Sequence, residues 1–191
     1  MSTQEFWGKQ GGADYTLRNM DIDWRKRAVF WRDTIPRDVE TAFEFGANIG
    51  TNLRAIRACR AIKASGIDIS QTAVDVAVSR GLAVQQGDML RAQVPPMFDL
   101  SFTCGVLIHM SPEQIGDAME QVAAMSRRYV MAVEYASESG TEEMIEYRGS
   151  SDLLWRRNYG ALYAEMGLRV ERSGDAGAGF DRCKFWLMKK A

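Results

Sequence analysis

Four stretches of this 191-residue chain combine residue types and spacing that could bind a small molecule and act on it. Residues 43–53, FEFGANIGTNL, run from an apolar strand-like segment through a glycine-punctuated turn into a helix-like pattern. Such a turn presents unpaired backbone N–H groups to a ligand. Asp68 and Asp88 end two later predicted strands, and His109, the only histidine, follows a fourth. Carboxylates can accept hydrogen bonds from ribose hydroxyls and an imidazole titrates near neutrality, so the four stretches together indicate a binding site.

The spacing of the turn distinguishes three ligands. A nucleoside triphosphate site would need G-x-x-x-x-G-K-[ST], and no lysine follows Gly50. A nicotinamide dinucleotide site would need G-x-G-x-x-G, whereas Gly46-x-Asn48-x-Gly50 lacks the middle glycine and the last interval. The stretch resembles the first motif of class I SAM-dependent methyltransferases, an acidic residue followed by G-x-G-x-G. Asn48 replaces the middle glycine, and asparagine enters the left-handed region readily, so the backbone path can survive.

The resemblance runs from about Phe43 to the C-terminus, and it implies S-adenosylmethionine (SAM) as cofactor. It places Glu44 near the amino group of SAM, Asp68 on the ribose hydroxyls and Asp88 on the adenine amino group. The full set of cofactor-binding residues that it implies is Tyr15, Arg18, Glu44, Gly46, Asn48, Gly50, Asn52, Asp68, Ile69, Asp88, Met89, Cys104 and Gly105. More narrowly, FEFGANIGTNL with GVLIHMSPE is similar to small bacterial methyltransferases associated with pseudaminic acid biosynthesis.

Methyl transfer from a sulfonium depends mainly on alignment of the acceptor, so a catalytic base is optional. His109 is the candidate base, and the alternative is a ring that packs beneath the cofactor and bonds a backbone carbonyl. Tyr147 and Arg148 are candidates to bind the acceptor. If the acceptor carries phosphate or carboxylate, either Arg148 or the pair Arg156 and Arg157 could hold it.

The elements that must position these residues alternate between strand and helix patterns. Strands are predicted at 43–45, 61–69, 82–86, 98–104, 129–133, 168–172 and 183–188, the fifth being apolar enough to be central. Helices are predicted from 53, from Ser70, from Ser111 and, as a long helix, over 152–166. The expected fold is therefore a doubly wound α/β domain with a mostly parallel seven-stranded sheet, Rossmann-like, that ends in an antiparallel hairpin.

Three further segments each have two interpretations. Residues 1–35 form a helical lid over the cofactor, which the resemblance implies, or a helix packed on the edge of the sheet. The glycine-rich turn 174–179 is a hairpin connection or, less expectedly, a substrate lid. The acidic residues of 138–146 favour a solvated face over an amine site. Of Trp155, Tyr159 and Tyr163, two are expected in the core and the third on a substrate platform.

Bulk composition limits the partners. The formal net charge of -1 gives no general electrostatic case for nucleic acid or an anionic membrane. Three dispersed cysteines and one histidine argue against a metal cluster and for reduced thiols, so we expect a cytoplasmic, single-domain protein spanning 1–191. The expected activity is SAM-dependent methylation of a small polar metabolite, such as a sugar or nucleotide sugar. The alternatives are an NAD-dependent oxidoreductase and a catalytically silent binding partner with the same fold.

Overall fold

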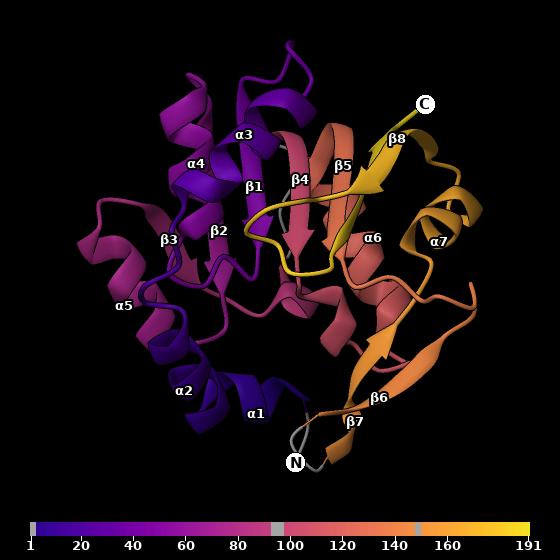
Figure 1. Cartoon of the computed structure of the whole chain (residues 1–191), viewed down its shortest axis with the longest axis horizontal. Coiled ribbons are helices and arrows are strands. Elements are labelled where there is room, and N and C mark those ends of the chain that lie inside the picture. The colour runs from indigo at the N-terminus through magenta and orange to yellow at the C-terminus, as the bar shows by residue number, and fades with distance from the viewer. Residues whose placement is uncertain (1–2, 93–97, 148–149) are drawn as a thin grey trace.

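A seven-stranded sheet forms the middle of the protein, in a computed structural model that describes residues 3–92, 98–147 and 150–191 (Figure 1). Its strands are β1 (Thr41–Phe45), β2 (Lys63–Asp68), β3 (Ala83–Gln86), β4 (Phe98–Cys104), β5 (Ser126–Glu134), β8 (Arg169–Asp175) and β9 (Lys184–Lys189). They lie in the order β3-β2-β1-β4-β5-β9-β8, and all neighbouring pairs are parallel except those that β9 makes. The predicted doubly wound sheet with a terminal antiparallel hairpin is confirmed.

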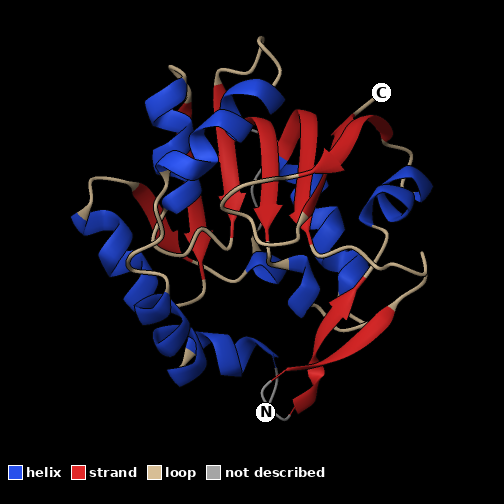
Figure 2. Cartoon of the chain, viewed as in Figure 1, coloured by secondary structure: helices blue, strands red, loops and turns tan. Residues whose placement is uncertain are grey.

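Helices cover both faces of the sheet (Figure 2). The helical elements are α1 (Thr3–Gly8), α2 (Gln10–Arg18), α3 (Arg25–Thr34), α4 (Thr51–Cys59), α5 (Gln71–Ser79), η1 (Met89–Arg91), η2 (Leu107–His109), α6 (Ile115–Met125) and α7 (Tyr159–Glu165). One apolar cluster joins α3, α4 and α5 to one face of the sheet. A second joins α6 and α7 to the other face. No helix within the described residues is long and apolar enough to cross a membrane.

The central position of β5 follows from its two apolar faces. In β5, Met131 and Val133 belong to the first cluster while Val130 and Ala132 belong to the second, so both faces are buried. Such a strand is stable only between two neighbours, and β5 lies between β4 and β9 as expected. Trp31 of α3 is fully buried against Phe102 of β4, with ring centroids 4.8 Å apart, so the N-terminal helices are anchored to the sheet.

The long helix expected over 152–166 is wrong. Residues 150–156 form β7 (Ser150–Arg156), which pairs antiparallel with β6 (Glu143–Tyr147), and only Tyr159–Glu165 is helical. Asn158 starts that helix because its side chain accepts a hydrogen bond from the Ala161 N–H at 3.1 Å. The apolar residues of 150–156 suit either period, and pairing with β6 decides between them.

The start of α6 also differs from the prediction. Ser111 Oγ donates to Glu113 at 2.7 Å instead of capping the helix, and Gln114 and Ile115 both donate their N–H to the Ser111 carbonyl. Residues 112–114 therefore form a turn, and the helix begins at Ile115. The predicted glutamine half of the capping box survives only as a 3.5 Å contact from Ser111 N to Gln114 Oε1.

Candidate functional site

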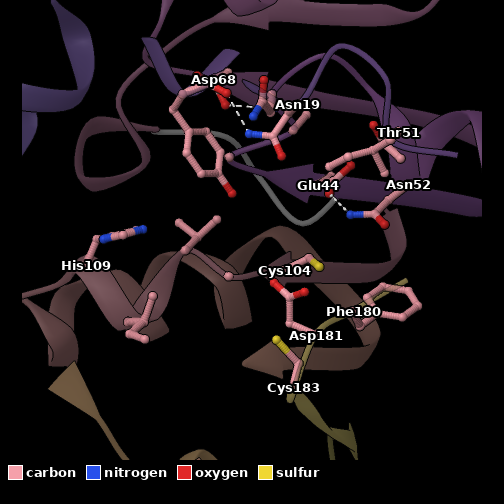
Figure 3. A pocket seen from close by; sticks show the side chains of 18 of the residues that line it. Asn19, Glu44, Thr51, Asn52, Asp68, Cys104, His109, Phe180, Asp181 and Cys183 are labelled. Atoms are coloured by element: carbon pink, nitrogen blue, oxygen red, sulfur yellow. Dashed lines mark hydrogen bonds between the residues drawn. The ribbon is translucent and has the colours of Figure 1, made fainter. Parts of the chain in front are cut away.

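A cavity of about 1130 Å³ lies where the parallel strands end. Because parallel strands carry their carboxyl ends at the same edge, the ends of β1, β2 and β4 meet there. Figure 3 shows Glu44, Asp68 and His109, from three separate segments, around this common space. The expected ligand residues that line it are Tyr15, Arg18, Glu44, Gly46, Asn48, Asn52, Asp68, Ile69, Asp88, Met89, Cys104, Gly105 and His109.

The turn between β1 and α4 is left-handed at three alternate positions. Gly46, Asn48 and Gly50 have φ angles of 69°, 47° and 75°. Asn48 therefore takes the conformation that the motif's missing glycine would supply, as the sequence predicted. Gly50 lies behind the turn, outside the cavity lining, where it caps α4 and an added Cβ would come within 2.3 Å of Leu82.

Glu44 is a fully buried carboxyl group with only one oxygen satisfied. Its Oε1 accepts a hydrogen bond from Asn52 Nδ2 at 2.6 Å, and its Oε2 has no partner in the described structure. Arg27 and Trp31 both donate to the Asn52 Oδ1, which turns the amide so that its N–H faces Glu44. Burial raises the pKa of Glu44 to about 8, so the carboxyl group is mostly protonated at pH 7 in the ligand-free fold. A cation beside Oε2 would favour its ionised form.

Asp68 accepts hydrogen bonds from two backbone N–H groups beside the cavity. One oxygen accepts from Asn48 N at 2.7 Å and the other from Ser70 N at 2.9 Å. Burial still raises the pKa of Asp68 above its ordinary value. Each oxygen keeps a second lone pair, so the carboxylate can accept further bonds from hydroxyl groups. Asp88 caps the short helix η1 through Leu90 N at 3.0 Å, and buried Met89 follows it in the lining.

Cys104 and Gly105 end the fourth strand and pass under the cavity. Burial raises the pKa of the Cys104 thiol to about 12, so it stays protonated and does not act as a nucleophile. Gly105 is left-handed, with φ 67°, and a Cβ at this position would meet no atom within 4 Å. The chain therefore leaves open space for a ligand beside Gly105.

His109 combines features of both roles considered for it. Its Nδ1 lies 3.2 Å from the Leu153 carbonyl, which can only accept, so the neutral ring carries its proton on Nδ1 and leaves Nε2 as an acceptor. Burial lowers the pKa of His109 to about 4, well below the intrinsic near-neutral value of a histidine side chain. The ring is thus neutral at pH 7 and a weak base.

A buried polar cluster that the sequence did not reveal holds the His109 segment in place. Glu134 Oε1 accepts from Val106 N at 3.0 Å and from Leu107 N at 3.1 Å, which fixes the start of η2. Arg157, 2% exposed, donates to the Leu107 carbonyl from the other side and pairs with Glu142 at 2.6 Å. Burial raises the pKa of Glu134 to about 7. Only the late position of Glu134 in an apolar strand could have signalled this role.

The first two helices reach the cavity from the N-terminal side. The Trp7 ring of α1 packs on the His109 ring, with centroids 4.3 Å apart, and on Tyr15 at 5.5 Å. Arg18 lies over the Tyr15 ring at 5.7 Å. These contacts place helix residues in the cavity wall, while their action as a lid stays a prediction.

The loop between β8 and β9 also lines the cavity, although we expected mainly a hairpin connection there. Arg27 Nε donates to the Gly179 carbonyl at 2.8 Å, and its guanidinium lies 4.7 Å from the centre of the Phe180 ring. Asp181 accepts a bond from Tyr135 Oη at 2.9 Å. Because β8 runs parallel to β5, the loop after it emerges at the same edge as the cofactor turn.

The expected acceptor residues are distributed differently from the prediction. Tyr147 ends β6, and Arg148 lies outside the described residues. Arg156 and Arg157, considered as a pair, separate: Arg156 lines the cavity, whereas Arg157 belongs to the buried cluster. Trp155, Tyr159 and Tyr163 are all buried outside the lining, so none of them is a substrate platform.

Comparisons with known proteins relate this chain to others through structure. Protein-family models give no match, and no curated protein matches by sequence. The mitomycin 7-O-methyltransferase MmcR superposes with a TM-score of 0.75 and 16% identity, over 100% of this chain and 61% of MmcR. The Burkholderia thailandensis 1,6-didemethyltoxoflavin-N1-methyltransferase, bound to 1,6-didemethyltoxoflavin and S-adenosylhomocysteine, gives 0.71 and 14%, over 90% and 80%. The Synechocystis PCC 6803 magnesium protoporphyrin IX methyltransferase, bound to SAM, gives 0.70 and 13%, over 100% and 98%. The chain thus has the fold that these methyltransferases share.

Proposed function

We propose that the protein is a SAM-dependent methyltransferase that acts on a small molecule. The observation that carries the proposal is the unpartnered Oε2 of buried Glu44 beside a left-handed turn. A cationic amine would satisfy that oxygen, and the adjoining space at Gly105 accepts ligand atoms. Asp68 and Asp88 line the same cavity. In this proposal Asp68 would accept hydrogen bonds from the ribose hydroxyls and Asp88 from the adenine amino group.

The similar structures support the cofactor, because several of them were determined with SAM or S-adenosylhomocysteine. An NAD-dependent reaction has weaker support, since the turn lacks the dinucleotide spacing. The silent-partner alternative rested on Asn48 in place of glycine, and the left-handed φ of 47° at Asn48 removes that objection.

The residues of this chain would act mainly by orientation. When bound, SAM supplies a methyl group on a positively charged sulfur, which is already activated toward in-line attack. His109, with Nδ1 committed to Leu153, would offer Nε2 to an acceptor hydroxyl or amine and orient its lone pair. Methyl transfer would break the carbon–sulfur bond and leave S-adenosylhomocysteine as a product. Nε2 or water would take up the proton that the acceptor loses. Glu134 would act as a positioning residue through the two amides that it holds.

A ligand-binding experiment tests this function. We expect SAM and S-adenosylhomocysteine to raise the melting temperature, since a ligand at a hundred times its Kd stabilises by about 2.7 kcal/mol. NADH should have no comparable effect. Asp68→Ala should weaken SAM binding by about tenfold or more because it removes acceptors from the ribose site. Asp117→Ala, on the exposed first turn of α6, is the matched control. The proposal would be rejected if only NADH raised the melting temperature, or if none of the three compounds did.

A further inference from the structure

Part of the cavity lining comes from the β6–β7 pair, which lies away from the turn between β1 and α4 (Figure 1). The cavity volume of about 1130 Å³ is above the usual range for a single-ligand site, roughly 300–1000 Å³. The residues that the pair contributes are Ile145 of β6 and Leu154 and Arg156 of β7. This antiparallel pair is separate from the main sheet, so this part of the lining does not come from the carboxyl ends of the parallel strands.

The register of β6 and β7 places these three side chains on one face. Ile145 and Leu154 are direct partners across the ladder, and Arg156 follows Leu154 by two residues. Met144 and Trp155, which are partners on the other face, do not line the cavity. The cavity face of the hairpin is therefore two aliphatic side chains followed by one cation.

The neighbouring part of the lining is also mostly apolar. Leu153 of β7 holds His109 of η2 through the bond to Nδ1, which brings the hairpin against η2. Ile108 and Met110 flank His109 in the lining, and the Trp7 ring packs on the imidazole. A polyhydroxylated molecule would leave hydroxyl groups without partners on such a wall, whereas an aromatic ring would bury its apolar surface there.

Arg156 differs from its neighbour Arg157 in having no acidic partner among the side chains that the structure describes. Arg157 is paired with Glu142. Glu143, the ladder partner of Arg156, has its Oε1 engaged by Ser137 and Ser139 instead. A half-buried guanidinium in a ligand cavity is best satisfied by a bidentate anion such as a carboxylate.

We infer that the methyl acceptor is an aromatic acid whose ring lies on Ile145 and Leu154 and whose anionic group binds Arg156. The inference rests on the proposed function for its reaction, but the binding site stands on the hairpin's own residues. It replaces the sugar derivatives considered from the sequence with a different acceptor class, aromatic compounds that carry one anionic group.

The test is calorimetric titration with three probes, in the presence and in the absence of S-adenosylhomocysteine. The probes are 3-hydroxy-2-naphthoate, neutral 2-naphthol, which lacks only its carboxylate, and glucose 1-phosphate as an anion without an aromatic ring. We expect the naphthoate to bind at least about tenfold more tightly than 2-naphthol, because it adds charge-assisted hydrogen bonds. Glucose 1-phosphate should bind more weakly than either naphthalene compound.

Variants locate the effect. Arg156→Gln should reduce naphthoate affinity to that of 2-naphthol without changing 2-naphthol binding, and Leu154→Asn should weaken both. Arg37→Gln, an exposed arginine before β1, should change neither. Equal affinities for naphthoate and 2-naphthol, an unchanged Arg156→Gln titration, or preference for glucose 1-phosphate would overturn the inference. If the wild type does not bind S-adenosylhomocysteine, the proposed function is rejected instead. The naphthoate titration in the absence of S-adenosylhomocysteine would still decide the acceptor site.

Discussion

Glu44→Gln tests whether the buried carboxyl group is the receptor for the cofactor's ammonium group. Burial raises the pKa of Glu44 from 4.5 to about 8, so ionising it in the ligand-free fold costs about 5 kcal/mol relative to the unfolded chain. Because the fold favours the protonated form, protonated Glu44 contributes fully to stability below pH 4.5, and this contribution is lost as the pH rises through 8. Glutamine is a neutral isostere, so Glu44→Gln should fold and lack that loss.

Cofactor binding should reverse the protonation of Glu44. An ammonium group beside Oε2 favours the carboxylate, so SAM binding at pH 6.5 should release close to one proton and should pay about 2 kcal/mol for it. SAM affinity should therefore rise by up to about tenfold per pH unit between pH 6 and 7.5.

Calorimetry in two buffers of different ionisation enthalpy measures this proton directly. The apparent binding enthalpy of the wild type should depend on the buffer, and that of Glu44→Gln should lose this dependence while its SAM affinity falls. A buffer-independent enthalpy in the wild type, or the same proton release in Glu44→Gln, would refute the assignment of Glu44 to the ammonium group.

Three other perturbations test the supporting structure. Gly46→Ala places a Cβ within 2.4 Å of Val106, so it should lower the melting temperature by several degrees more than Gly81→Ala, which is equally left-handed but meets no atom within 4 Å. His109 has its pKa lowered to about 4, so its contribution to stability is full above pH 6.5 and is lost as the pH falls toward 4. Between pH 7.5 and 5, the free energy of unfolding measured with denaturant should therefore fall by about 2 kcal/mol more in the wild type than in His109→Phe. Glu134→Ala should be destabilised by about 2–5 kcal/mol because it leaves the N–H groups of Val106 and Leu107 without an acceptor. Glu134→Gln, which keeps an acceptor, should recover most of that stability, and equal losses in both variants would contradict the positioning role.

The parts of the fold that the sequence predicted correctly are those with local causes. The strand, left-handed turn and helix at 43–59 follow from short-range conformational preferences, and Asn48 takes the expected conformation. Asp68 and Asp88 could be placed in one cavity because strand ends converge in any parallel sheet. These inferences need no knowledge of distant contacts.

The errors arose where distant pairing decides the structure. Residues 150–156 are apolar in a pattern compatible with helix or strand, and only β6 selects the strand. The role of Glu134 depends on amides 27 and 28 residues earlier in the chain, which no local pattern specifies. The lowering of the His109 pKa from its intrinsic near-neutral value to about 4 also could not be predicted locally, because burial by distant segments causes it.

The loop between β8 and β9 shows that topology can locate a site where residue type does not. Glycine and small residues at 174–179 indicate only a flexible connection. Once β9 is known to be antiparallel, however, β8 must run with β1 to β5, and the loop that follows it must open at the cofactor edge. Arg27 then binds both this loop and Asn52, so the N-terminal helices, the first turn and the last hairpin are joined by one guanidinium. Arg27→Ala should therefore loosen all three around Glu44. It should weaken SAM binding more than Arg54→Ala, whose guanidinium lies over the Trp24 ring at 5.0 Å and forms no hydrogen bond to the other described side chains.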